Sequence, residues 1–182
     1  VSNINVYGFA IFLIFLLVFS NASFLFNLST EALGGFAGTF IERILITGES
    51  VGTQWPQWWT TFYWFSWMAW APTSGAFMGQ IAYGRKVKHV LGLYVGLCAS
   101  VSAIWMVLVS GTSLWVQTSG LFDLVASYDR GVENVPYDML GALPLGNLII
   151  PLFVVLIFLS TITACNSNCI AMAGISTQGI NP

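Results

Sequence analysis

Charged side chains are scarce in this sequence. Its 182 residues include five Lys or Arg, seven Asp or Glu and one His, so that only 7% are charged, whereas an ordinary soluble domain carries about 25% charged residues. Hydrophobic residues make up 57% of the chain, and the mean hydropathy is +0.81. This composition excludes an ordinary soluble domain and indicates a membrane protein, for which we expect the lipid bilayer and no nucleic acid as a partner.

Residues that build enzyme active sites or metal sites are also few. Cys165 and Cys169 are four residues apart, but no His or carboxylate lies near them in the sequence to complete a metal site, and with Cys98 the number of cysteines is odd. The cysteines are therefore interpreted as packing residues. The only histidine, His89, is expected to be solvated. Because no nucleophile, base and orienting acid can be assembled within the apolar stretches, an enzyme is the weakest hypothesis, and we expect no catalytic residue.

The charged residues leave four long apolar stretches between them. They form three clusters, which are Glu31, Glu42, Arg43 and Glu49; Arg85, Lys86 and Lys88; and Asp123, Asp129, Arg130, Glu133 and Asp138. The apolar stretches cover about 6–28, 59–83, 90–116 and 145–175, and each reaches the roughly 20 residues that a helix needs to cross the hydrocarbon core. They show no period-2 alternation, which excludes membrane strands. The sequence predicts an all-α membrane protein, one transmembrane region with four transmembrane helices.

The basic residues predict the orientation of these helices. The segment GRKVKH, residues 84–89, holds three of the five basic residues and no acid, so we expect it to face the cytoplasm, and with it both chain ends. The acidic clusters then face outwards, in a multi-pass protein of the inner (plasma) membrane. The N-terminal segment has no initiator Met, no basic region and no cleavage site, so we expect it not to be a signal peptide and the chain to start within a longer protein.

The first outer segment, 31–58, contains FIERILITGES, in which apolar residues recur at helical spacing. A short interfacial helix on the outer surface explains this pattern better than a flexible linker. A plain loop is the alternative.

Six of the eight tryptophans lie within residues 55–72. Trp55, Trp58 and Trp59 come where the chain enters the membrane, where interfacial tryptophan is common. The next three, Trp64, Trp67 and Trp70, are spaced by three, so they fan over about 120° of one helix at increasing depth. A lipid-facing belt does not continue downwards in this way, whereas an aromatic-lined cavity does.

Two further features favour the cavity. Pro72 removes a helical hydrogen bond, so we expect a break or kink near the middle of the membrane, and irregular backbone at that depth is tolerated where it lines a cavity or is buried in protein. No carboxylate lies in the predicted helices. Indole faces without carboxylates suit a quaternary ammonium group, which has no hydrogen to donate and binds by cation–π contact. An aromatic packing helix is the alternative.

The same residues resemble a known family. FYWFSWMAWAP, residues 62–72, followed by GQIAYGRKVKH, residues 79–89, looks like the signature helix and loop of the betaine/choline/carnitine transporters. The stretch ALPLGNLIIPLFVVLIFLSTITACNSNCIAMAG, residues 142–174, is similar to a later helix of that family. The resemblance spans about 8–179. It implies a piece of a twelve-helix carrier with an inverted-repeat (LeuT-like) secondary transporter fold, and a homotrimeric assembly.

The resemblance also implies site residues. The aromatic box falls partly on Trp67 and the cytoplasmic side of the pathway on Trp70, with Trp64 on the same helix, while Ser66 stands where the family usually has tryptophan and widens the pathway. The sodium site of the family falls on Thr163, but Ala164 replaces a serine hydroxyl, and Asn166 replaces an acid common in some members. Sodium is the only coupling ion or cofactor expected.

Three hypotheses follow from these observations. The first is a secondary active transporter of a quaternary ammonium solute of the glycine betaine, choline or carnitine type, coupled to sodium in symport. The second is a sodium-independent exchanger of the same family. The third is a structural or channel-like membrane subunit whose tryptophans only pack.

Overall fold

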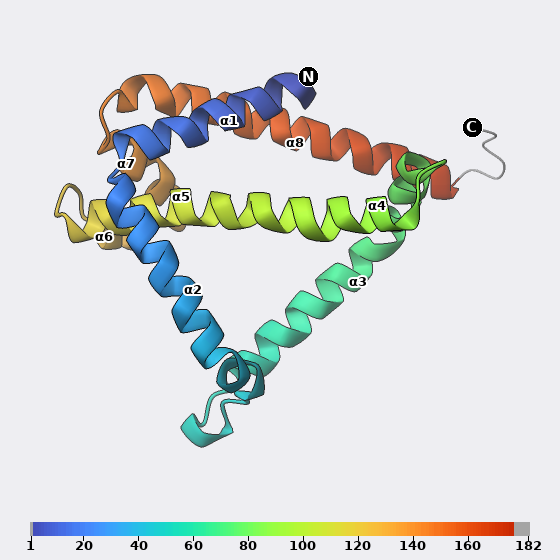
Figure 1. Cartoon of the computed structure of the whole chain (residues 1–182), viewed down its shortest axis with the longest axis horizontal. Coiled ribbons are helices and arrows are strands. Elements are labelled where there is room, and N and C mark those ends of the chain that lie inside the picture. The colour runs from blue at the N-terminus through green and yellow to red at the C-terminus, as the bar shows by residue number, and fades with distance from the viewer. Residues whose placement is uncertain (1, 177–182) are drawn as a thin grey trace. The chain divides into compact units, whose positions relative to one another are not determined.

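The chain is helical throughout the part that the structure describes. The structure is a computed structural model, and it describes residues 2–176, among which there is no strand. The predicted all-α class is confirmed. The elements in chain order are α1 (Ser2–Phe19), α2 (Ala22–Leu45), the 3-10 turn η1 (Glu49–Val51), α3 (Trp55–Ala82), α4 (Val87–Leu91), the π-helical segment η2 (Gly92–Leu97), α5 (Cys98–Thr118), α6 (Leu124–Arg130), the 3-10 turn η3 (Val132–Asn134), α7 (Val135–Gly141) and α8 (Gly146–Ser176) (Figure 1).

These elements divide into two compact units. Among the described residues, unit 1 consists of 2–32 and 91–163, and unit 2 of 33–90 and 164–176. Unit 1 thus contains α1, the start of α2, α5 to α7 and the first half of α8, and unit 2 contains α3 and α4.

Three of the four predicted crossings coincide with helices that are long and apolar enough to span a membrane. These are Ser2–Phe19, Val87–Thr118 and Gly146–Gly174. The fourth prediction, 59–83, falls on α3, which is 28 residues long and uncharged. The helix α3 is not among the three that are apolar enough to span, because its indole and phenol rings lower its mean hydropathy. A crossing at α3 therefore stays a prediction.

The first helix, predicted over 6–28, is present but ends earlier than predicted. The chain interrupts it at Ser20 and Asn21, between α1 and α2. Asn21 caps the new helix, because its side-chain oxygen accepts a hydrogen bond from the backbone N–H of Phe24 at 3.0 Å. A capping asparagine satisfies a donor that the first helical turn leaves unpaired, so it defines a helix start even within an apolar run.

The helix predicted within 31–58 is present over residues 31–45, but it is the end of α2 and not a short helix of its own. The residues up to Leu45 continue α2 without a break, and only the 3-10 turn η1 follows before α3. Thr30 and Thr39 each donate a side-chain hydrogen bond to the carbonyl oxygen four residues earlier, at 2.9 and 2.7 Å. Such bonds let polar residues stay within a helix, which is why the change in composition near Glu31 does not end α2.

The core of unit 1 forms where α1, α5, α7 and α8 meet. Its buried side chains include Phe12, Leu16, Leu108, Leu140 and Phe153. The ring of Phe12 stacks on Phe153 with centroids 4.9 Å apart and contacts Trp105 at 5.9 Å, so one aromatic cluster joins α1, α5 and α8.

A polar network organises the segment between α5 and α8, which the sequence showed only as an acidic loop. Asp123 caps α6 by accepting from the backbone N–H of Val125 and Ala126 at 3.1 and 3.2 Å. Ser127 is fully buried and donates to Asp138 Oδ2 at 2.6 Å. Arg130 pairs with the same oxygen at 2.8 Å. The network therefore links α6 to α7.

Replacing Asp138 with alanine should destabilise this segment by about 1–2 kcal/mol, because the buried Ser127 hydroxyl loses its short bond to a charged acceptor and keeps only the longer one, at 3.3 Å, to the carbonyl oxygen of Asp123. The ion pair itself contributes little, since the Arg130 side chain is 60% exposed. Thermal denaturation of the purified full-length protein measures the loss. Asp129→Ala, at an exposed neighbouring carboxylate, is the matched control. Equal effects of the two substitutions would show that the network does not stabilise the fold.

Candidate functional site

The tryptophan-rich segment begins at a well-defined helix start. Pro56 occupies the first turn of α3, where its missing N–H costs no hydrogen bond. The backbone N–H of Trp55 donates to the hydroxyl of Thr53 at 3.2 Å, and the Gln57 side chain donates to the carbonyl of Thr47. Gly48 holds the preceding turn with φ 78°.

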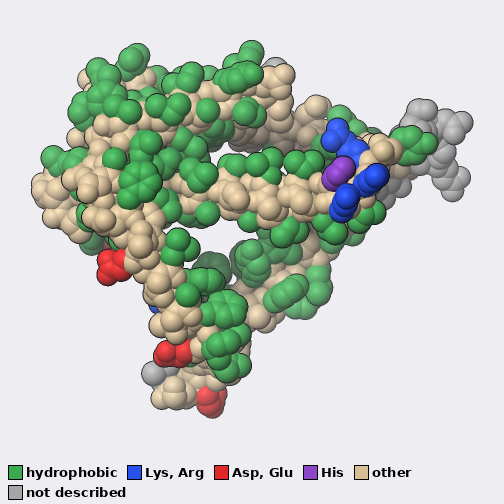
Figure 2. Space-filling view, in the orientation of Figure 1, with side chains coloured by type: hydrophobic (Ala, Val, Ile, Leu, Met, Phe, Trp, Pro, Cys, Tyr) green, Lys and Arg blue, Asp and Glu red, His purple; other side chains and the backbone are tan. Residues whose placement is uncertain are grey.

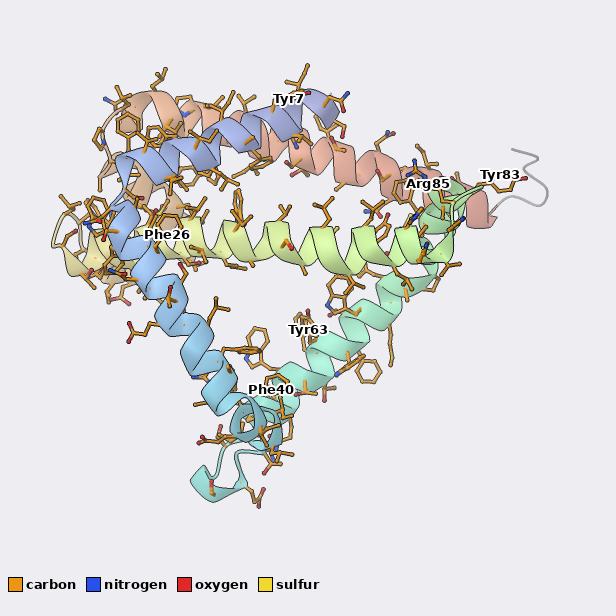
Figure 3. All side chains as sticks on the ribbon, in the orientation of Figure 1. Tyr7, Phe26, Phe40, Tyr63, Tyr83 and Arg85 are labelled. Atoms are coloured by element: carbon orange, nitrogen blue, oxygen red, sulfur yellow. The ribbon has the colours of Figure 1, made fainter. Side chains whose placement is uncertain are left out.

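Aromatic rings form a stripe along α3. Trp55, Trp59, Tyr63 and Trp67 follow each other at intervals of four, so they share one helix face. The rings of Trp55 and Trp59 lie 5.9 Å apart and those of Tyr63 and Trp67 lie 6.0 Å apart, measured between centroids. Figure 3 labels Tyr63, which projects from the middle of this helix. Tyr63 was not predicted, because the interval of three that connects Trp64, Trp67 and Trp70 skips it, whereas the interval of four includes it.

A shallow, open groove runs along the N-terminal part of this stripe. It has a volume of about 500 Å³ and is lined by Trp55, Trp59, Thr60, Tyr63 and Trp64. Ligand pockets typically measure about 300–1,000 Å³, so the space suits a small solute. A single helix supplies only one wall, and none of the α3 residues is buried in the part of the chain that the structure describes.

The four residues predicted on this helix are arranged differently with respect to the groove. Trp64 lines it directly. Trp67 extends the stripe below it through its contact with Tyr63. Trp70 lies further toward the C-terminal end of α3, with 52% of its surface exposed, and Ser66 is half-buried.

Of the break or kink predicted at Pro72, the break is wrong, and the kink stays a prediction. The helix α3 continues through Pro72 to Ala82. Proline removes one hydrogen bond of the helical ladder, and the turns before and after it keep theirs, so a membrane helix can hold proline without ending.

Charge is absent from α3 and concentrated just after it. The helix contains no Asp, Glu, Lys or Arg between Trp55 and Ala82. Gly84, with φ 75°, turns the chain, and Arg85, Lys86, Lys88 and His89 follow, all exposed. Figure 2 shows these basic side chains and the histidine gathered at one place. The aromatic groove is therefore a neutral surface.

The predicted ion-binding residue lies on α8. Thr163 is half-buried and its hydroxyl donates to the carbonyl oxygen of Leu159 at 2.8 Å. A hydroxyl oxygen is the hard, neutral donor that sodium accepts, so the residue fits such an ion chemically. The backbone carbonyls of the neighbouring turns are engaged in a continuous helix, and Ala164 adds no oxygen from its side chain. Further ligands would have to come from other segments.

Comparison with known proteins gives the family. The model of BCCT, the betaine/carnitine/choline family transporter, matches residues 1–182. The chain belongs to this family. Proteins of the BCCT family are transporters and not enzymes, as the sequence led us to expect, and they are membrane proteins.

The chain is also similar to two curated transporters. The chain is 26% identical over 183 residues to the ectoine/hydroxyectoine transporter of Virgibacillus pantothenticus, a match that covers 100% of this chain and 36% of the relative. It is 26% identical over 181 residues to a probable glycine betaine transporter of Desulfitobacterium hafniense (strain Y51), covering 98% of this chain and 36% of the relative. The chain thus spans about a third of the length of these relatives.

Proposed function

We propose that this chain is part of a secondary active transporter that carries a quaternary ammonium solute, of the glycine betaine, choline or carnitine type. The observation that supports it best is the aromatic stripe of α3, which offers indole faces and a groove on a helix without any charge. A quaternary ammonium group cannot donate a hydrogen bond, so a carboxylate adds little selectivity, whereas a desolvated cation–π contact adds about 2 kcal/mol or more.

Within this proposal the residues of α3 have separate roles. Trp64 and Tyr63 form the wall that the solute meets first, because both line the groove. Trp67, at the lower end of the stripe, holds the ammonium group, and Trp70 contacts the solute on its way to the cytoplasm. Ser66 leaves more room beside Trp67 than a tryptophan would.

We further propose that sodium drives the uptake. Thr163 supplies one hydroxyl oxygen, and other oxygens come from segments of the protein outside this chain. Because Ala164 has no hydroxyl, the ion is held by fewer oxygens, and its apparent affinity should be weak. The basic turn at 84–89 and both ends of this chain face the cytoplasm in the inner (plasma) membrane, by the excess of positive charge, and the full-length protein assembles as a homotrimer.

A second candidate substrate is an ectoine-type solute. One relative is an ectoine/hydroxyectoine transporter. Ectoine carries a delocalised ring cation with N–H groups, and such a flat cation also stacks on indole. The two substrate classes therefore differ in that only the ectoine type has N–H groups to donate. The hydroxyl oxygens of Thr60 and Ser66 on α3 could accept hydrogen bonds from them.

Uptake measurements on the full-length protein test the proposal. Proteoliposomes should accumulate a radiolabelled ammonium solute, and sodium should stimulate this uptake with a weak apparent affinity. A panel of betaine, choline, carnitine and ectoine as unlabelled competitors identifies the substrate class. Uptake that is equal in sodium and potassium but needs a solute on the other side would replace symport by exchange. No accumulation of any member of the panel would refute the transport proposal.

A further inference from the structure

Helices α1 and α8 pack along a regular seam within unit 1. Phe12 stacks on Phe153 at 4.9 Å, Gly8 receives the side chain of Leu156, and Asn5 hydrogen-bonds Ser160 at 2.7 Å. Residue numbers decrease along α1 as they increase along α8, so the two helices are antiparallel, as Figure 1 shows for their ribbons. A Cβ on Gly8 would lie 2.3 Å from Leu156 Cδ2, so the absence of a side chain at Gly8 makes room for the Leu156 side chain.

The character of the seam changes along its length. It is aromatic at Phe153, aliphatic at Leu156 and polar at Ser160. On α8 these positions are spaced by three and four, the interval that keeps residues on one helix face. The next position in this pattern is Thr163, which therefore continues the α1-facing side of α8 one turn beyond the Asn5 contact.

The contact between Asn5 and Ser160 is directional. The amide Nδ2 of Asn5 donates to Ser160 Oγ, while Asn5 Oδ1 is buried without a hydrogen-bond partner in the described part of the chain. Burying an amide oxygen without a partner is unfavourable, so an apolar residue would pack here at lower cost. Packing alone therefore does not explain an asparagine here, and what it adds is the hydrogen bond to Ser160.

We propose that Asn5 is a positioning residue for Thr163. Apolar contacts such as Phe12 with Phe153 hold the two helices together but are non-directional. The amide–hydroxyl bond fixes the rotation of α8 at Ser160. Because the Thr163 hydroxyl is held against its own helix by the carbonyl oxygen of Leu159, this rotation sets the place of its oxygen three residues later. The inference rests on the proposed function, specifically on the role of Thr163 in binding sodium.

The test uses sodium-dependent thermal stabilisation of the purified full-length protein, because an ion that binds only the folded state raises its melting temperature. Potassium chloride at equal ionic strength is the reference. Asn5→Leu should raise the half-saturating sodium concentration by about tenfold, the lower end of the effect seen when a group that orients a metal ligand is removed. Solute affinity at saturating sodium should stay within twofold of the wild-type value, roughly the spread between independent measurements of weak effects.

The chain offers a matched control and a second variant. Asn3→Leu makes the same substitution at an exposed position two residues earlier and should leave the sodium dependence unchanged. Ser160→Ala removes only the acceptor oxygen, so it serves if the leucine variant does not fold, and should reproduce the effect. With Thr163→Ala as background, Asn5→Leu should add no further loss, because the residue it orients is gone.

A second experiment tests the seam itself. In a protein without the native cysteines, the pair Asn5→Cys and Ser160→Cys should cross-link with Hg²⁺, while Asn3→Cys with Ser160→Cys should not. Absence of the first cross-link, an unchanged sodium dependence in both Asn5→Leu and Ser160→Ala, or a wild-type protein that sodium does not stabilise would overturn the positioning role. Loss of ammonium uptake in the panel above refutes the transport proposal separately, since sodium stabilisation is measured without solute.

Discussion

Replacing Trp67 with leucine is expected to weaken the affinity for the ammonium solute by more than tenfold. The indole is 58% exposed in this chain and extends the stripe that lines the groove. Leucine has similar apolar character but no π face, so it loses a cation–π contact of about 2 kcal/mol. Solute protection of tryptophan fluorescence and the concentration dependence of uptake in the full-length protein both measure the change.

Two further variants make the result specific for Trp67. Trp67→Phe keeps an aromatic face and should lose less than the leucine variant. Trp58→Leu removes a more exposed tryptophan, 73% against 58%, at the start of α3, where an interfacial role is predicted, and should not alter the affinity. Unchanged affinity in Trp67→Leu at normal membrane expression would return this residue to a packing role, and a larger loss in Trp64→Leu would move the solute up into the groove.

Substituting Gly146 with alanine should destabilise the protein by on the order of 3 kcal/mol, the upper part of the range for overpacking. A Cβ there would lie 2.7 Å from the carbonyl oxygen of Leu140 and 2.9 Å from the Cα of Gly141. Both atoms belong to the backbone, so no side chain can rotate away. The neighbouring turn has little room to adapt, because Leu145 already has a positive φ of 65°. Thermal denaturation of the purified protein in detergent measures the loss.

Gly34→Ala is the matched control for this substitution. Gly34 lies inside α2, and nothing lies within 4 Å of the position that its Cβ would occupy. Alanine is the better helix former by about 1 kcal/mol, so this variant should be as stable as the wild type or slightly more stable. If the Gly146→Ala and Gly34→Ala proteins have the same melting temperature, the turn between α7 and α8 can relax to accept the added methyl group.

The fold could be predicted where composition decides it. Long uncharged stretches identify α3, the run from η2 to α5, and α8 as long helices, because a stretch of about 20 residues without charge is what a membrane helix requires of its sequence. The break between α1 and α2 is marked instead by one hydrogen bond that the Asn21 side chain accepts from the backbone N–H of Phe24, and the surrounding apolar residues gave no sign of it. The polar network around Ser127 and Asp138 was missed because its members look like ordinary loop residues until the chain folds.

The candidate site was predictable only in part for a related reason. The tryptophans identified α3, because their number and spacing are visible along the chain. The pairing of Asn5 with Ser160 joins residues 155 positions apart. No local pattern contains such a contact, since it depends on the register between two helices.

The π-helical segment Gly92–Leu97 has a bearing on how this chain is aligned with others. Its last turn is closed by a bond from the backbone N–H of Cys98 to the carbonyl oxygen of Leu93, five residues back instead of four. Such a turn holds one additional residue and shifts the angular phase of all later side chains by about 100°. A helical wheel drawn from Val87 straight through to Thr118 therefore assigns the residues after the π-helical segment to wrong faces relative to those before it. A relative with a regular helix here should align with this chain only after a one-residue gap.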